Sequence, residues 1–274
     1  MASRVTARTT EGSTPRSRVE LRFLCHEPCR VNEAVRNEGG TIEILGRPRR
    51  AAIPHPEQSG SLPAVLTTGA KPRKFIAVAG NIGAGKSTMV DFLCHSYGWR
   101  PFTEPNALNP YLDDFYSDMD AWAFHSQISF LAHKFRIHME LMQEAETVVQ
   151  DRTIYEDAEI FARYLHQAGH MSDRDFGTYS DLFTAMKQAL APPDLLIRLE
   201  CSVRALRRRI KKRGRPEEQD IPLKYLKSLQ GLYEDWFDSY DLCPVLVINT
   251  ERLDYIGDLV HRLEVRSALE PFLT

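Results

Sequence analysis

A glycine-rich stretch between residues 80 and 88 holds the side chains best suited to chemistry in this chain. Its sequence fits the pattern G-x-x-x-x-G-K-[ST], in which backbone N–H groups and a lysine surround a phosphate chain. Glycines allow such a loop to approach a polyphosphate without Cβ clashes. Lys86 is expected to reach the β- and γ-phosphates, and the Ser87 hydroxyl to bind Mg²⁺. The predicted phosphate-binding residues are Gly80, Asn81, Ile82, Gly83, Ala84, Gly85, Lys86, Ser87 and Thr88.

Further polar groups follow three short apolar runs and are candidates for the same site. Glu104 ends the first run, the pair Asp151-Arg152 ends the second, and Glu200 ends the third. A dense cationic segment, residues 207–215, comes soon after the third run. Because the rest of the domain is acidic, this cluster of positive charge is informative.

Apolar runs and longer helical stretches alternate along the chain from Lys74 onward. Such β-α alternation predicts a parallel sheet covered by helices on both faces. Ligands of these folds lie beyond the C-terminal ends of the strands, where the polar groups above are placed. The predicted strands are 75–79, 99–103, 147–151, 194–200 and 244–249. The predicted helices are 88–94, 109–116, 120–144, 154–167, 173–189, 202–213, 222–240 and 253–269.

Residues 1–73 differ in composition from the rest of the chain. They are rich in Arg, Ser, Thr, Pro and Gly, which predicts a mostly disordered extension before a domain at 74–274. Their arginines could instead belong to an organelle transit peptide, although Glu11 and Glu20 weaken that interpretation. A start of the reading frame upstream of the true domain is a third possibility. We expect a cytoplasmic protein, with the mitochondrial matrix as the alternative.

Charge and cysteine content exclude several classes of protein. The formal net charge is −2, divided into +6 for residues 1–74 and −8 for the remaining 200. This balance argues against nucleic-acid binding, and no apolar run approaches the length of a membrane span. Five scattered cysteines fit a reducing compartment better than a disulfide framework. Cys25 and Cys29 lack a second ligand pair at zinc spacing.

The joint set of motifs resembles the deoxyribonucleoside kinases over about residues 74–250. The motifs are the glycine loop, Glu104-Pro105, Asp151-Arg152-Thr153 and Arg213-Gly214-Arg215. Asn109-Pro110-Tyr111-Leu112 and residues 151–157 look most like the bacterial deoxyadenosine/deoxyguanosine kinase branch. The resemblance implies a P-loop NTPase-type sheet of five parallel strands, flanked by helices, with a lid at about 207–219. It also implies transfer of the γ-phosphoryl group of ATP, with Mg²⁺, to a deoxynucleoside 5′-hydroxyl.

Catalytic roles follow from the same resemblance. Glu104 would accept the 5′-hydroxyl proton, Arg152 would hold Glu104 and the 5′-oxygen, and Asp151 would position Mg²⁺ through its water shell. The lid residues implied to neutralise charge on the transferring group are Arg209, Arg213 and Arg215. The alternatives are a solvated or helix-capping carboxylate for Glu104, a structural ion pair for Asp151 and Arg152, and a solvated basic face for the lid.

Sugar recognition is implied for two residues. Tyr116 and Glu218 match family positions that bond the 3′-hydroxyl, and a tyrosine there would crowd a ribose 2′-hydroxyl. Ordinary helix-end packing is the alternative for Tyr116.

Base recognition is implied for four residues. Gln127 and Lys134 are seven residues apart and so share one helix face. An amide both donates and accepts, which matches the pairing edge of adenine or cytosine, whereas a Glu at position 127 would suit guanine. Asp157 pairs near the base with Arg in many relatives, and Lys134 departs from that Arg and lacks its planar fork. Phe161 falls where an aromatic ring stacks on the base. Packing on a helix face or in the core is the alternative for Gln127 and Phe161.

Three classes of function remain open from the sequence. A purine deoxynucleoside kinase that favours deoxyadenosine leads, with a deoxyguanosine or broad-specificity enzyme, including deoxycytidine, as the runner-up. A non-catalytic kinase-fold subunit and a thymidylate-type nucleotide kinase are the other classes. By resemblance we also expect a homodimer formed through helices 120–144 and 154–167.

Overall fold

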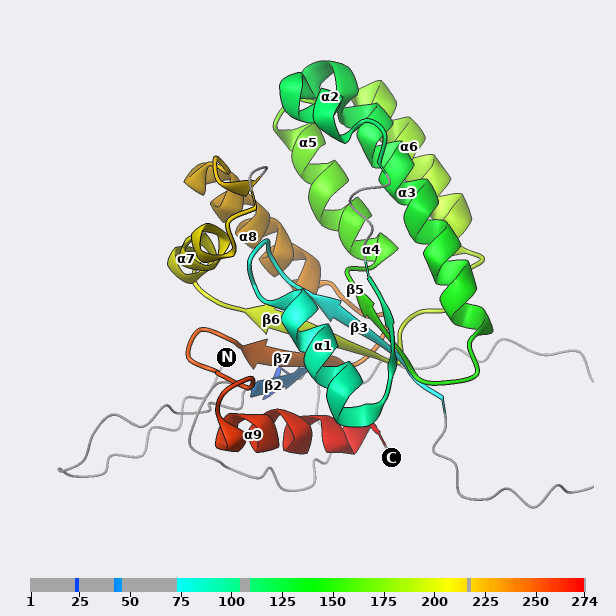
Figure 1. The fold of residues 1–274 in the computed structure, drawn as a ribbon. Coiled ribbons are helices and arrows are strands. Elements are labelled where there is room, and N and C mark those ends of the chain that lie inside the picture. The colour runs from blue at the N-terminus through cyan, green and yellow to red at the C-terminus, as the bar shows by residue number, and fades with distance from the viewer. Residues whose placement is uncertain (1–22, 25–41, 46–72, 104–108, 216–217, 274) are drawn as a thin grey trace, which may run out of the picture.

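A parallel β-sheet with helices on both faces frames the molecule (Figure 1). The computed structural model describes residues 23–24, 42–45, 73–103, 109–215 and 218–273. The parallel strands follow the order β7-β6-β3-β5-β4 across the sheet. The five predicted parallel strands are confirmed as β3 (Phe75–Ala79), β4 (Arg100–Phe102), β5 (Val148–Asp151), β6 (Leu195–Glu200) and β7 (Val245–Asn249).

Two short strands extend the sheet beyond β7. Strand β2 (Ile42–Leu45) pairs antiparallel with β7, and β1 (Phe23–Leu24) pairs parallel with β2. Apart from these strands and Arg73, residues 1–73 lie outside the described part of the chain. The predicted disorder of this extension and the domain boundary at 74 therefore stay predictions.

Strand β3 is the middle one of the five parallel strands, and all five of its side chains are buried. It hydrogen-bonds to β5 on one side and to β6 on the other. A strand buried on both faces requires a continuous apolar run, and the sequence FIAVA supplies one. The loop that follows β3 consequently starts between two hydrogen-bonded neighbouring strands.

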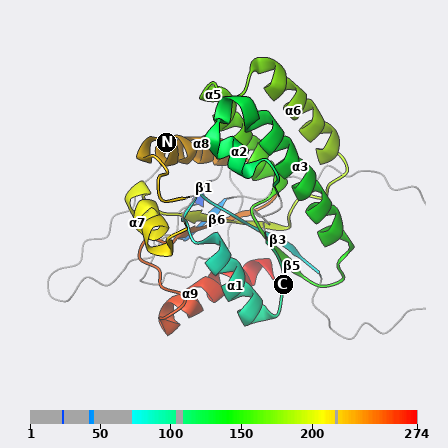
Figure 2. The ribbon, with the colours of Figure 1, turned by 45° about the horizontal axis from the view of Figure 1, so that its top comes forward.

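Side chains alternate between two cores, one on each face of the sheet. On one face, Ile76 and Val78 pack with α1 (Lys86–Tyr97), α7 (Val203–Arg213) and α9 (Leu259–Leu269). The other core is larger in aromatic content and includes Phe75, Ala77 and Ala79. Figure 2 shows α1 and α9 on one side of the sheet. The helices opposite are α2 (Leu112–Ser117), α3 (Met119–Gln143), α4 (Ile154–Glu156), α5 (Arg163–Gln167), α6 (Asp173–Lys187) and α8 (Leu223–Asp238).

The predicted helix 154–167 is confirmed, but its middle is wound differently. A π-helical segment, η2 (Asp157–Ala162), joins α4 to α5 without a break. Such segments are rare and often occur at functional sites. Two predicted site residues, Asp157 and Phe161, lie within it.

The predicted start of the last helix is wrong by six residues. Helix α9 begins at Leu259 rather than at 253, and a short 3-10 turn, η4 (Glu270–Phe272), follows it. The Asp254 carboxylate accepts hydrogen bonds from the backbone N–H groups of Ile256 and Gly257, which closes a turn instead. Asp258 then caps α9 by accepting from Val260 and His261.

Two general expectations can be compared with the described residues. No helix among them combines the length and apolar character that crossing a bilayer requires. Cys94, Cys201 and Cys243 are free thiols, while Cys25 and Cys29 lie outside the described residues.

Candidate active site

The glycine loop connects β3 to α1 and lies against β6 and α7. Gly80 has φ 150°, and a Cβ there would lie 2.7 Å from the Leu199 carbonyl oxygen. Gly83 has φ 81°, and a Cβ there would lie 2.9 Å from the Ile210 side chain. Both positions therefore require glycine, for backbone conformation and for space. This confirms the strand–loop–helix arrangement that a P-loop needs.

Lys86 and Asn81 stabilise the shape of this loop from within. The Lys86 ammonium donates hydrogen bonds to the carbonyl oxygens of Gly80 (2.7 Å) and Asn81 (3.1 Å). The Asn81 side chain donates to Leu226 O in α8 (3.0 Å) and accepts from Ile82 N (2.8 Å). The lysine is buried, and water therefore screens its charge less, which strengthens its attraction for an anion bound at the loop.

Ser87 links the loop to the end of β5. Its hydroxyl donates a hydrogen bond of 2.8 Å to Asp151 Oδ2. Ser87 and Thr88 are exposed in the first turn of α1, whereas Asp151 is buried. The predicted pair of metal-binding residues is thus brought together. Among the described residues, no cluster of three or more His, Cys, Asp or Glu side chains could hold a metal.

Arg152 follows Asp151 in an unusual backbone conformation. Its φ is 61°, a left-handed value that is uncommon for residues other than glycine. The guanidinium lies over the Phe161 ring at 4.3 Å from the centroid, and Nε lies 3.4 Å from Glu156 Oε1. Lys134 Nζ donates to the Arg152 carbonyl oxygen at 2.7 Å. Three predicted site residues, Arg152, Lys134 and Phe161, therefore meet at the end of β5.

Glu104, the predicted base, lies outside the described residues. The strand that leads to it is described, since Phe102 of β4 pairs with Gln150 of β5. The C-terminal ends of β4 and β5 are therefore adjacent. The role of Glu104 stays a prediction.

The residues predicted to bind the nucleoside differ in their exposure. Gln127, Lys134 and Asp157 are buried, while Tyr116 is 48% exposed beside Phe115. The Gln127 Oε1 atom is buried and makes no hydrogen bond. Buried amide oxygens almost always have a partner, so this atom is a candidate for a ligand contact.

The arginines of the predicted lid segment lie in two different environments. Arg209 donates to Ala84 O in the glycine loop (3.0 Å) and to Thr250 Oγ1 after β7 (2.8 Å), and it also reaches the Thr250 carbonyl. Arg213 and Arg215 both pair with Glu218, the latter at 3.4 Å. Arg209 is thus tied to the phosphate loop, and the predicted sugar ligand Glu218 holds the two outer arginines.

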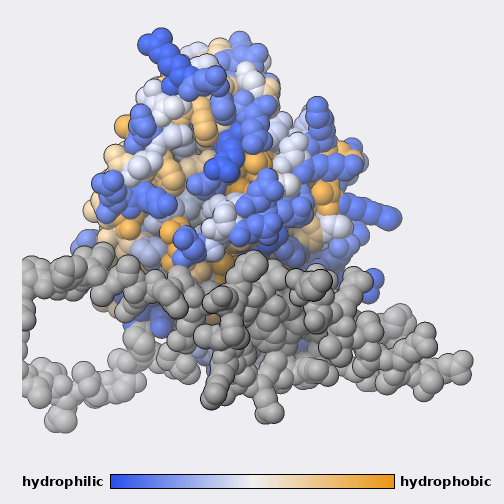
Figure 3. Space-filling model, turned by 180° about the vertical axis from the view of Figure 1, so that it is seen from behind, coloured by the Kyte–Doolittle hydropathy of each residue, from blue (hydrophilic) through white to orange (hydrophobic). Residues whose placement is uncertain are grey.

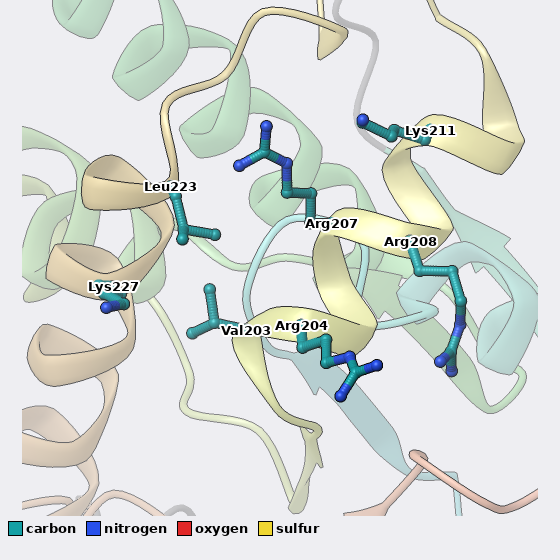
Figure 4. Close-up of a pocket in the computed structure, with 7 residues that line it drawn as sticks. All are labelled: Val203, Arg204, Arg207, Arg208, Lys211, Leu223 and Lys227. Carbon is teal, nitrogen blue, oxygen red and sulfur yellow. The ribbon is translucent and has the colours of Figure 1, made fainter.

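Helix α7 also presents cations away from the loop. A groove of about 520 Å³ lies between α7 and α8, and Figure 4 shows the residues that line it. Arg207, Arg208 and Lys211 of the predicted lid segment are among them, whereas the residues predicted to bind the phosphates or the nucleoside are not. Arg204 and Arg208 point away from α8 in this view. The residues that line the groove are Val203, Arg204, Arg207, Arg208, Lys211, Leu223 and Lys227.

Sequence reasoning missed three residues that the structure places at the loop: Glu156, Tyr233 and Thr250. Glu156 lies inside the motif 151–157, four residues after Arg152, and this spacing of opposite charges is the signal that could have marked it. Tyr233 and Thr250 come from α8 and from the end of β7, and no local pattern marks them. Burial and the Glu156 charge raise the pKa of Tyr233, so its hydroxyl stays protonated as a donor.

Comparison with known proteins gives a consistent result. The sequence model of the family described as deoxynucleoside kinase matches residues 76–274. The chain is 39% identical to the deoxyadenosine/deoxycytidine kinase of Bacillus subtilis, over 67% of this chain and 85% of that protein. It is 35% identical to a deoxyguanosine kinase of Lactobacillus acidophilus, over 68% and 85%. The structure of deoxyadenosine kinase from M. mycoides with bound dATP superposes with a TM-score of 0.62 at 29% identity, covering 73% of this chain and all of that one.

Proposed function

The chain belongs to the deoxynucleoside kinase family, and on that premise we propose that it phosphorylates deoxynucleosides with a preference for deoxyadenosine. The family's reaction moves the γ-phosphoryl group of a nucleoside triphosphate to the 5′-hydroxyl of the nucleoside. The observation that carries the proposal is the meeting of Ser87, Asp151 and Arg152 where β5 ends beside the glycine loop.

Binding of the donor phosphates falls to the glycine loop and the N-terminus of α1. Backbone N–H groups and the helix dipole face an anion there, and Lys86 adds a full positive charge. Arg209 is held against the loop by Ala84, so its charge is in place before the donor binds. We propose ATP as the donor.

Ser87 and Asp151 fit Mg²⁺ by the chemistry of their ligands. Both supply oxygen atoms, and Mg²⁺ in kinases keeps several waters while it binds one or two protein oxygens and the phosphates. The sparse protein ligand set around Ser87 suits this mode of binding. Ser87 would ligate the ion and Asp151 would hold one of its waters. When bound, the ion supplies neutralisation of charge on the phosphate chain.

On the acceptor side, Arg152 and Glu104 would orient and deprotonate the 5′-hydroxyl. The Phe161 ring and Glu156 restrict the Arg152 guanidinium, which suits a group that must hold a reacting oxygen in place. General bases contribute roughly 10²- to 10⁴-fold. We therefore expect Glu104→Gln to lower kcat by at least about a hundredfold, and a near-normal rate would remove Glu104 from this role.

Lid closure would involve an exchange of partners at Glu218. This carboxylate pairs with Arg213 and Arg215 in the structure. When Glu218 binds the 3′-hydroxyl, as the resemblance implies, the two arginines would be released toward the phosphates. Binding of the nucleoside would thereby bring the positive charges of these two arginines to the donor phosphates.

Base preference rests mainly on Gln127. Its buried acceptor without a partner supports a contact to an exocyclic amine. The amide N–H group could then donate to the neighbouring ring nitrogen, which is an acceptor in adenine and cytosine but carries a proton in guanine. The printed names of relatives include deoxyadenosine, deoxycytidine and deoxyguanosine kinases. A broad-specificity or deoxyguanosine kinase is therefore the second candidate.

The experiment is a product assay on the purified protein. It contains ATP and Mg²⁺ with each of the four deoxynucleosides separately, and adenosine as a ribose control. The proposal expects the highest kcat/KM for deoxyadenosine and a poor value for adenosine. A higher value for deoxyguanosine would overturn the base preference and leave the kinase reaction intact. A parallel reaction with thymidylate tests the nucleotide-kinase alternative, which phosphorylation of thymidylate in preference to every nucleoside would support.

A homodimer is also part of the proposal. The face seen in Figure 3 carries hydrophobic residues in small groups among hydrophilic ones, which gives no single broad apolar patch there. Of the large apolar side chains on α3, Met139 is 37% exposed. Light scattering at working concentration tests the proposal, and a monomeric mass would reject it.

A further inference from the structure

Glu156 is a fully buried carboxylate with partners on both sides of the candidate active site. It lies in α4, directly after β5, and is 0% exposed. Its Oε1 atom accepts hydrogen bonds from Gly80 N (3.3 Å) and from the Tyr233 hydroxyl, and it lies 3.4 Å from Arg152 Nε. One oxygen atom thus connects the phosphate loop, the end of β5 and helix α8.

On the donor side, Glu156 and Tyr233 hold the first residue of the glycine loop. Glu156 accepts from the Gly80 N–H, and the Tyr233 hydroxyl lies 2.9 Å from the Gly80 carbonyl oxygen. Lys86 donates to that same carbonyl oxygen at 2.7 Å. Movement of Glu156 would therefore displace Gly80 and, through the Gly80 carbonyl oxygen, Lys86.

On the acceptor side, Glu156 faces one edge of the Arg152 guanidinium. The Phe161 ring covers its flat face at 4.3 Å, so the guanidinium is restricted from two directions. The left-handed backbone of Arg152 brings its side chain back toward the helix that follows. The orientation of the arginine consequently depends on a negative charge at position 156.

The remaining oxygen of Glu156 is poorly accommodated. Oε2 is buried and makes no hydrogen bond. A buried carboxylate oxygen without a donor lowers stability, and this cost partly offsets the gain from the contacts that Oε1 makes.

We propose that Glu156 is a positioning residue that holds Gly80 of the phosphate loop and the Arg152 guanidinium in a fixed mutual geometry. The donor phosphates and the acceptor hydroxyl are thereby kept at the distance and orientation that transfer requires. This inference rests on the proposed function, because it assigns Arg152 to the acceptor side of a phosphoryl transfer.

The first test is Glu156→Gln, which keeps the size of the side chain and an acceptor for Gly80 but removes the charge that faces Arg152. Misplacement of reacting groups by about 1 Å costs on the order of 10²-fold in rate. We expect kcat to fall by about tenfold to a hundredfold while KM for both substrates changes little. The matched control is Glu264→Gln on α9, another buried carboxylate with an oxygen that makes no hydrogen bond. It should leave kcat unchanged.

A double-mutant cycle with Arg152→Lys separates positioning from general packing. Lysine keeps the charge and loses the planar fork that Glu156 orients. If Glu156 acts through Arg152, Glu156→Gln should cost much less kcat in the Arg152→Lys background than in the wild type. Equal losses in both backgrounds would overturn the proposal, as would a normal kcat for Glu156→Gln.

Tyr233→Phe is the second test variant, to be used if Glu156→Gln does not fold. It removes one hydroxyl that bonds Glu156 and Gly80, and Tyr179→Phe, at another buried tyrosine, is its control. A lower kcat for Tyr233→Phe alone supports the proposal, and equal kcat for both contradicts it. Failure of the proposed function is distinguishable, because the wild type itself would then phosphorylate no deoxynucleoside.

Discussion

The Ser87 hydroxyl donates a hydrogen bond of 2.8 Å to the Asp151 carboxylate, across 64 residues of sequence. This contact joins the first turn of α1 to the end of β5. It places two oxygen ligands suited to Mg²⁺ between the phosphate loop and Arg152. The residues proposed to bind the metal and the donor, and the arginine proposed for the acceptor side, are therefore positioned by adjacent strands of one sheet.

Asp151→Asn should weaken the use of Mg²⁺. The amide cannot supply the negative charge that orders a metal-bound water, and loss of such outer contacts typically costs about 10- to 100-fold in affinity or activity. We expect the Mg²⁺ concentration for half-maximal rate to rise, measured by titration at saturating substrates. Asp194→Asn is the control, because Asp194 accepts from Phe75 N at the opposite end of β3. An unchanged titration for Asp151→Asn would remove it from the metal site.

Arg209→Ala and Arg213→Ala should separate stability from catalysis. Arg209 bonds Ala84 and Thr250, so its loss leaves acceptors without donors and should lower the free energy of unfolding by about 1–3 kcal/mol. Arg213 is exposed, and its buried partner Glu218 keeps Arg215 as a second partner, so loss of Arg213 should cost less than about 1 kcal/mol. Both variants should lower kcat by about 10²-fold or more.

Urea unfolding and initial rates measure the two effects. Arg208→Ala, whose side chain points away from α8 in Figure 4, is the control and should change neither. The account of the lid is contradicted if Arg208→Ala lowers kcat as much as Arg213→Ala does.

Gln127→Glu should move the base preference toward deoxyguanosine. A carboxylate accepts from the guanine N–H groups but cannot donate to the adenine ring nitrogen. We expect the ratio of kcat/KM for deoxyguanosine to that for deoxyadenosine to rise by about tenfold or more. Gln143→Glu, at the exposed end of the same helix, should leave the ratio as it is. A ratio that does not move would show that Gln127 packs without touching the base.

Stability should fall as the pH drops through the range of His138. Burial lowers the pKa of this side chain, although its hydrogen bond to the Ala191 carbonyl acts in the opposite direction. The unfolded state therefore binds a proton below about pH 6.5 that the folded state resists, which lowers the free energy of unfolding. Urea unfolding at several pH values should show a shallower decline for His138→Gln than for the wild type. The exposed His95→Gln should behave like the wild type, and equal slopes in all three proteins would contradict the assignment.

The strands and most helices could be predicted because each carries its own burial pattern. FIAVA is apolar at every position since β3 is covered on both faces, and the glycine pattern after it requires the P-loop conformation. The start of α9 could not be predicted in the same way. Apolar spacing continued through 253–258, but the Asp254 side chain satisfied backbone donors in a turn and ended the helical pattern there.

The candidate site was predicted only in the parts that a local motif contains. Lys86, Ser87 and Asp151 belong to such motifs, and the structure brings them together. The attachment of Arg209 to Thr250 and that of Glu156 to Tyr233 join segments 41 and 77 residues apart. Contacts of that kind depend on how helices pack against the sheet, which residue spacing does not encode.

The central claim is transfer of the γ-phosphoryl group to the 5′-hydroxyl of a deoxynucleoside, and labelled transfer tests it most directly. The wild type and Lys86→Met are incubated with γ-labelled ATP, Mg²⁺ and deoxyadenosine, and the products are separated. We predict that the wild type places the label in the 5′-monophosphate, and that Lys86→Met loses about 10²-fold or more of this rate. ATP bound without consumption, or hydrolysed to free labelled phosphate with no labelled nucleotide, would contradict the account.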